Sequence, residues 1–97
     1  WPIRYKDLAP WYSHVEKFVG IAGDLDGIPE LPDGEFLPGM TLNCIEEHFK
    51  ETVAKNYKNT RHVISGRCAH ITENRDIFIK QGRSQCQYRN LCQRGCP

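Results

Sequence analysis

The stretch GIAGDLDGIPELPDGEFLPGM, residues 20–40, governs how the rest of the chain is organised. It contains five glycines and three prolines, a density that neither an α-helix nor a central β-strand tolerates. The sequence therefore predicts a long irregular connection between two flanking elements. A loop of this length is uncommon in a compact domain, and it often has a function or lies against a partner. Its glycines lack the G-x-G-x-x-G spacing of a dinucleotide-binding turn, so we expect no phosphate cradle here.

An amphipathic helix is predicted before this loop, over residues 7–19. Asp7 is a suitable N-cap, Pro10 falls in the first turn, and Gly20 supplies a C-terminal stop. We interpret the apolar stripe of this helix as a core face, part of which packs on something outside the chain. The stripe consists of Leu8, Trp11, Tyr12, Val15, Phe18 and Val19.

A second amphipathic helix is predicted after the loop, over residues 43–58. Asn43 can cap it, and Glu46 completes a capping box three residues later. Acidic side chains come early and lysines late, as the helix dipole prefers, so the charged side is expected to face solvent. The apolar stripe consists of Leu42, Ile45, Phe49, Val53 and Tyr57.

The periodicity changes in residues 61–80, where we expect short strands. Three short apolar runs, at residues 62–64, 68–72 and 76–79, are separated by turn-forming residues. The Cys-rich tail, residues 83–97, has no periodicity. The expected fold class is α+β, with two amphipathic helices, a few short strands and long irregular loops.

Length and charge limit the functions that are open to the chain. Ninety-seven residues make one small domain or a piece of one, and no apolar run approaches the ~20 residues of a transmembrane helix. Residues 1–60 carry ten acidic and six basic side chains, whereas residues 61–97 carry two acidic and seven basic ones. Because the seven basic residues are spread out rather than clustered, we expect no nucleic-acid partner.

The chemistry-bearing segment is the C-x5-C-x3-C-P pattern of Cys86, Cys92 and Cys96. Its last part matches the end of a bacterial ferredoxin motif, and thiolates are the ligands that iron–sulfur clusters require. A zinc site is the second possibility and would need Cys68 or His70 as a fourth ligand. Disulfides or free thiols are the third possibility. The four histidines have no serine or carboxylate arrangement of a catalytic triad, so no catalytic residue is assigned.

A family resemblance is carried by residues 1–12, WPIRYKDLAPWY, followed by Val15 and Glu16. This stretch resembles the pattern W-P-[IL]-x-Y-x-D-[LI]-x-P-[WY]-Y-x-x-[VA]-E of bacterial sugar and gluconate dehydrogenases, which are flavoproteins of the glucose–methanol–choline (GMC) oxidoreductase family. Further similarity lies in LPDGEF at residues 31–36, in residues 61–70 and in residues 83–97. The resemblance covers nearly the whole chain and is looser between residues 39 and 61.

The resemblance implies that residues 1–97 are an internal fragment of a larger enzyme that uses FAD. Such an enzyme oxidises an alcohol or sugar hydroxyl by hydride transfer to the flavin. The fragment would be a partial domain of the flavoprotein, from the region between the FAD-binding and substrate parts. Its main partner would be the remainder of its own polypeptide, and the isolated chain would neither bind FAD nor catalyse.

The resemblance also gives the tail a function. In similar glucose dehydrogenases that work with a cytochrome, three cysteines hold a three-iron cluster that relays electrons from FAD. Carried over, Cys86, Cys92 and Cys96 would be ligands of an iron–sulfur cluster, and a cytochrome or another electron acceptor would be the onward partner. Many relatives have an additional cysteine within this motif, where the chain has residues 87–91.

A function of a different class stays open from the residues alone. The chain could be a small stand-alone binding module of an exported protein, stabilised by disulfides or by a metal. As an enzyme fragment it would belong to the bacterial cytoplasm or periplasm.

Overall fold

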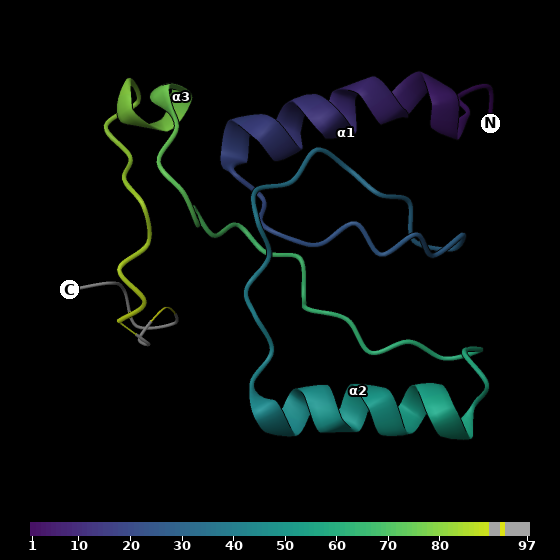
Figure 1. Cartoon of the computed structure of the whole chain (residues 1–97). Helices are drawn as coiled ribbons and strands as arrows, with labels where there is room; N and C mark the ends of the chain where they lie inside the picture. The colour runs from purple at the N-terminus through teal and green to yellow at the C-terminus, as the bar shows by residue number, and fades with distance from the viewer. Residues whose placement is uncertain (90–91, 93–97) are drawn as a thin grey trace.

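The computed structural model describes residues 1–89 and residue 92. Three helices occur in this part of the chain: α1 (Tyr5–Val19), α2 (Cys44–Asn56) and the short α3 (Asp76–Ile79). Irregular segments connect them, and α1 and α2 lie at opposite ends of the molecule (Figure 1). The long connection predicted over residues 20–40 is present and contains no helix.

Helix α1 begins earlier than the sequence indicated. Its N-cap is Arg4, whose backbone N–H donates to Oδ2 of Asp7 at 2.9 Å, so Asp7 is the third helical residue and not the cap. Pro10 therefore lies in the second turn, where it cannot donate to the carbonyl four residues earlier. The end at Gly20 is as predicted: φ is 84°, and its N–H donates to the carbonyl oxygen of Glu16.

Helix α2 confirms its predicted start. Oδ1 of Asn43 accepts hydrogen bonds from the backbone N–H groups of Ile45 and Glu46, at 2.9 and 3.0 Å. In return, the N–H of Asn43 donates to Oε2 of Glu46 at 2.8 Å, which completes the capping box. The helix ends two residues before the predicted end, and the chain then turns through Lys58 and Asn59 with φ values of 50° and 59°.

The prediction of short strands in residues 61–80 is wrong for the described structure. Residues 62–64 form no strand, and in residues 68–72 Cys68 makes one isolated antiparallel bridge to Ala22. Residues 76–79 form helix α3. Periodicity cannot distinguish a strand from a helical turn in an apolar run this short. The described part is thus helix-rich with isolated bridges and without a sheet, so the β half of the expected α+β class is not confirmed.

The core is small and lies where segments distant in sequence meet. Ala22, Leu37 and Phe78 are the buried apolar residues of the described chain, and Ile71 packs against them. Ala22 pairs in parallel with Leu37 and in antiparallel with Cys68, so three irregular segments are joined by backbone hydrogen bonds. Phe78 brings α3 onto this junction.

The chain exposes far more surface than a self-contained domain. A folded monomer of this mass exposes about 5,700 Å², whereas this chain exposes 7977 Å². Its radius of gyration is 16.1 Å, against about 12.5 Å for a compact domain of the same length. The two predicted apolar stripes account for part of this surface, because Trp11 is 69% and Ile45 76% exposed. Among the described residues, neither helix has a buried side chain, and Val19, Leu42 and Val53 are the half-buried members of the two stripes.

None of the helices in the described residues is both long enough and apolar enough to cross a bilayer. This agrees with the expectation from the sequence.

Candidate cysteine–histidine site

The site lies where the segment after α3 runs back along residues 70–74. The backbone N–H of Cys86 donates to the carbonyl oxygen of Ile71 at 2.8 Å. The side chain of Gln85 donates to the carbonyl oxygen of Thr72 at 2.7 Å, and its backbone N–H donates to Oδ1 of Asn74 at 3.0 Å. These three bonds bring Cys86 beside His70, although the two residues are 16 positions apart.

His70 lies between two cysteine sulfurs. Its Nε2 is 3.0 Å from Sγ of Cys86, and its Nδ1 is 3.4 Å from Sγ of Cys68. The Tyr88 ring stacks on the imidazole with 6.0 Å between centroids and 15° between planes. The backbone N–H of Tyr88 also donates to Sγ of Cys86 at 3.3 Å. The arrangement is a thiol–imidazole–thiol chain with one aromatic neighbour.

The three members differ in their exposure and support. Cys86 and His70 are half-buried, whereas Cys68 is exposed. Cys68 is nevertheless fixed to the core, because it exchanges backbone hydrogen bonds of 2.8 and 3.2 Å with the buried Ala22. The half-buried Cys86 thus lies at Nε2 of the imidazole ring, and the exposed Cys68 lies at Nδ1 of the same ring.

The predicted cluster ligands are placed only in part. Cys86 and Cys92 are described, with free thiols, while Cys96 lies outside the described residues. Within residues 1–89 and 92, no three histidine, cysteine or acidic side chains form a group able to hold a metal ion. The donor types still fit soft metal chemistry, because thiolates suit iron–sulfur clusters and thiolate with imidazole suits zinc.

Sequence reasoning named His70 only as an optional zinc ligand and missed its contact with two sulfurs. The contact of His70 with Cys68 could have been expected from their spacing, since alternate residues of an extended segment point to the same side. Cys86 and Tyr88 reach His70 because the chain turns back after α3, and no pattern among neighbouring residues predicts this turn.

A second polar cluster ties the long loop to the rest of the chain. The Asp33 carboxylate accepts hydrogen bonds from the backbone N–H groups of Asp26 and Gly27 at 2.9 and 3.1 Å. Arg67 contacts Oδ1 of Asp33 at 3.1 Å and donates to the carbonyl oxygen of Pro32 at 2.7 Å. Its guanidinium also lies 4.6 Å from the centre of the Phe36 ring. The cluster is a structural anchor for the loop.

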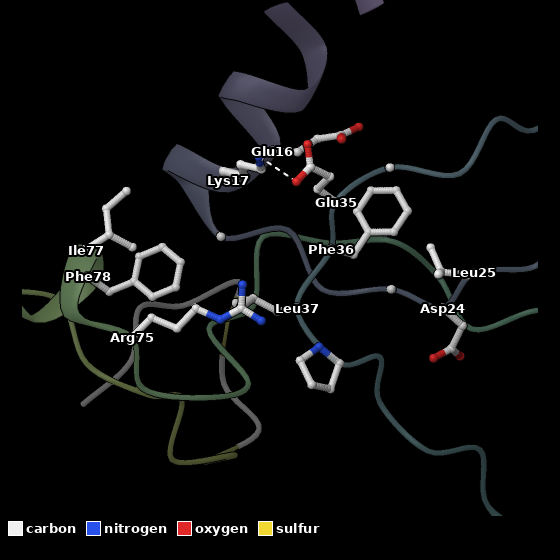
Figure 2. A pocket seen from close by; sticks show the side chains of 14 residues that line it. Glu16, Lys17, Asp24, Leu25, Glu35, Phe36, Leu37, Arg75, Ile77 and Phe78 are labelled. Carbon is white, nitrogen blue, oxygen red and sulfur yellow. Dashed lines mark ion pairs between the residues drawn. The ribbon is translucent and has the colours of Figure 1, made fainter. Parts of the chain in front are cut away.

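An open cavity of about 720 Å³ lies between the end of α1, the loop and α3. Figure 2 shows Lys17 facing Glu35 across an ion pair of 2.5 Å, with Phe36 and Phe78 on opposite sides of the cavity. The side chain of Arg75 also lines it (Figure 2). Among the described residues, the cavity contains no cysteine or histidine, so the candidate chemistry lies elsewhere.

Comparison of the chain with protein-family models, with curated proteins and with solved structures finds no match in any of the three.

Proposed function

We propose that this chain is part of an FAD-dependent oxidoreductase of the GMC type and that it packs against the rest of that polypeptide. The observation that supports this most strongly is the uncovered surface of the chain. It exceeds that of a compact monomer by about 2,300 Å². Interfaces of obligate assemblies reach this size, and large apolar side chains such as Trp11 and Ile45, 69% and 76% exposed, contribute to the excess.

The GMC-like segment at residues 1–16 supports the same proposal. Its Asp7 completes the hydrogen bonding at the start of α1. Its aromatic residues then lie on the exposed side of that helix, with Trp11 69% and Tyr12 58% exposed. A motif that builds a helix and leaves its aromatic side chains uncovered is suited to docking on a larger body.

The proposed enzyme oxidises an alcohol or sugar hydroxyl by hydride transfer to FAD, and its catalytic residues lie outside this chain. Here Cys86, Cys92 and Cys96 would hold an iron–sulfur cluster. When bound, such a cluster supplies one-electron transfer from the flavin to a cytochrome or another acceptor. The contribution of the chain itself is the placement of the half-buried Cys86, whose sulfur accepts a hydrogen bond from the backbone N–H of Tyr88 and lies 3.0 Å from Nε2 of His70.

The test uses the full-length polypeptide that contains these 97 residues. We expect it to bind FAD and to lose flavin absorbance when a sugar or alcohol is added without oxygen. The isolated chain is the matched control and is expected to bind no flavin. Tight stoichiometric flavin binding by the isolated chain, or no flavin in the full-length protein, would refute the proposal.

The stand-alone module is the second candidate. Its metal-stabilised form is favoured by donor type alone, since thiolate and imidazole suit zinc, whereas among the described residues Cys68, His70 and Cys86 form no group able to hold a metal ion. That form predicts stoichiometric zinc in the isolated chain after purification. The enzyme proposal predicts none there, and metal analysis of the alkylated and unalkylated chain distinguishes the two.

A further inference from the structure

We propose that the cavity between the end of α1, the loop and α3 binds an organic cation, a molecule with an apolar body and an ammonium or guanidinium group at one end. The volume of the cavity, about 720 Å³, is that of ordinary ligand pockets, which are apolar concavities with a few oriented polar groups. The inference concerns a second site. It depends neither on a flavin nor on the cysteine–histidine site.

The two aromatic rings that line the cavity are held in place by arginines. The guanidinium of Arg67 lies 4.6 Å from the centre of the Phe36 ring, and that of Arg83 lies 5.0 Å from the centre of the Phe78 ring. Arg83 is itself fixed, because it donates a hydrogen bond to the carbonyl oxygen of Val19 at 2.7 Å. A ligand therefore meets apolar walls that are already formed, which lowers the entropy lost on binding.

The charges that line the cavity favour a cation over an anion. Lys17 forms an ion pair with Glu35 at 2.5 Å. Arg75 forms one with Glu73, so both cations of the lining already have a carboxylate partner. The half-buried Glu16 also lines the cavity, and within the part of the chain that the structure describes its carboxylate forms no hydrogen bond or ion pair. A bound cation supplies this carboxylate with a partner.

The position of Glu16 indicates where the cationic end of the ligand lies. A Cβ placed at Gly34 would be 2.7 Å from the Phe36 ring and would collide with Oε2 of Glu16, so the ring and the carboxylate meet at one point of the loop. Figure 2 shows both on one side of the cavity, together with Asp24, and Phe78 on the opposite side. A cation beside Glu16 also contacts the Phe36 ring, which attracts positive charge. The apolar body of the ligand then extends toward Phe78.

The experiment measures the binding of 3-phenylpropylguanidinium to the full-length polypeptide labelled with 4-fluorophenylalanine. Phe36→Leu and Phe49→Leu assign the two fluorine resonances that are followed. We expect the Phe36 resonance to shift with a dissociation constant on the order of 1 mM, as for a small ligand in an open site. The Phe49 resonance, from α2, should stay where it is. 3-Phenylpropylurea has nearly the same shape without the charge and should bind about tenfold more weakly.

Glu16→Gln keeps the size of the side chain and should weaken guanidinium binding about tenfold. Glu47→Gln removes an exposed carboxylate from α2 and is the matched control. Gly34→Ala should abolish binding by displacing the carboxylate and the ring, whereas Gly66→Ala, where a Cβ meets nothing within 4 Å, should bind as the wild type does. A Phe36 resonance that does not respond, equal affinities for the guanidinium and the urea, or an unchanged affinity in Glu16→Gln would overturn the inference. None of these outcomes bears on flavin binding, which tests the proposed function separately.

Discussion

At the scale of single residues, the small core depends on close approaches that leave no room for additional atoms. Gly20 has a φ of 84°, and a Cβ placed there would be 3.1 Å from Cζ of Phe78 and 3.3 Å from Cγ1 of Ile71. The residue therefore ends α1 and also lets the aromatic ring of α3 reach the junction.

Gly20→Ala is expected to destabilise the protein by ~1–3 kcal/mol, because the left-handed backbone and the crowded Cβ both oppose a side chain. Thermal unfolding of the full-length protein measures the effect. Gly66→Ala is the matched control, since a Cβ at Gly66 meets nothing within 4 Å. Equal melting temperatures for the two variants would contradict the role assigned to Gly20.

Arg67→Ala is expected to loosen the loop over residues 26–36, since it removes a charge-assisted contact to Asp33 and the bond to the carbonyl of Pro32. Hydrogen bonds of charged groups contribute ~1.5–3 kcal/mol each, with context deciding the value. Limited proteolysis should cut this loop faster in the variant. Lys80→Ala, a change at an exposed cation, is the control and should leave the cleavage rate as it is.

At the scale of elements, α1 and α2 owe their ends to local hydrogen bonds more than to packing. Neither helix contains a buried residue. The capping box of α2 was readable from the sequence, because Asn43 and Glu46 satisfy each other within one turn. The start of α1 was not, since Asp7 looks like a cap and acts instead as the third residue of a box that begins at Arg4.

Asn43→Ala is expected to weaken α2 by about 1 kcal/mol, since two backbone N–H groups lose their acceptor. Hydrogen exchange of the amides in the first turn reports this loss as faster exchange. Asn56→Ala is the control, because it changes the same residue type at the other end of the helix. In this variant the first-turn amides should keep their wild-type exchange rates. Equal exchange in both variants would exclude the cap as the stabilising feature.

At the scale of the whole molecule, the apolar surface is the main finding. Trp11, Tyr12 and Phe18 are between 51% and 69% exposed on α1, and Ile45 and Phe49 are 76% and 58% exposed on α2. Since the two helices lie at opposite ends of the molecule (Figure 1), a covering body would have to contact both of these ends. This arrangement accords with a chain that folds together with a larger polypeptide.

The isolated chain is expected to self-associate through these apolar faces, and Trp11→Ser should shift it toward the monomer. Sedimentation velocity at several concentrations measures the change. In the full-length protein the same substitution should lower the melting temperature, because it removes a docking contact. Lys6→Ser, another exposed residue of α1, is the control for both measurements. A monomeric wild-type chain at high concentration would argue against the docking role of α1.

The sequence by itself determined the two long helices, the cap at Asn43, the stop at Gly20 and the irregular loop between them. These features depend on interactions among residues a few positions apart, which composition and spacing report directly. Only the tertiary structure decided that residues 76–79 are helical, that α1 and α2 have no buried side chain among the described residues, and that His70 lies between Cys68 and Cys86. Each of these features depends on which distant segments of the chain lie side by side. Long-range contacts at Ala22, Leu37 and Phe78 set that arrangement. No local pattern encodes such contacts, because their partners are separated by many residues of irregular backbone.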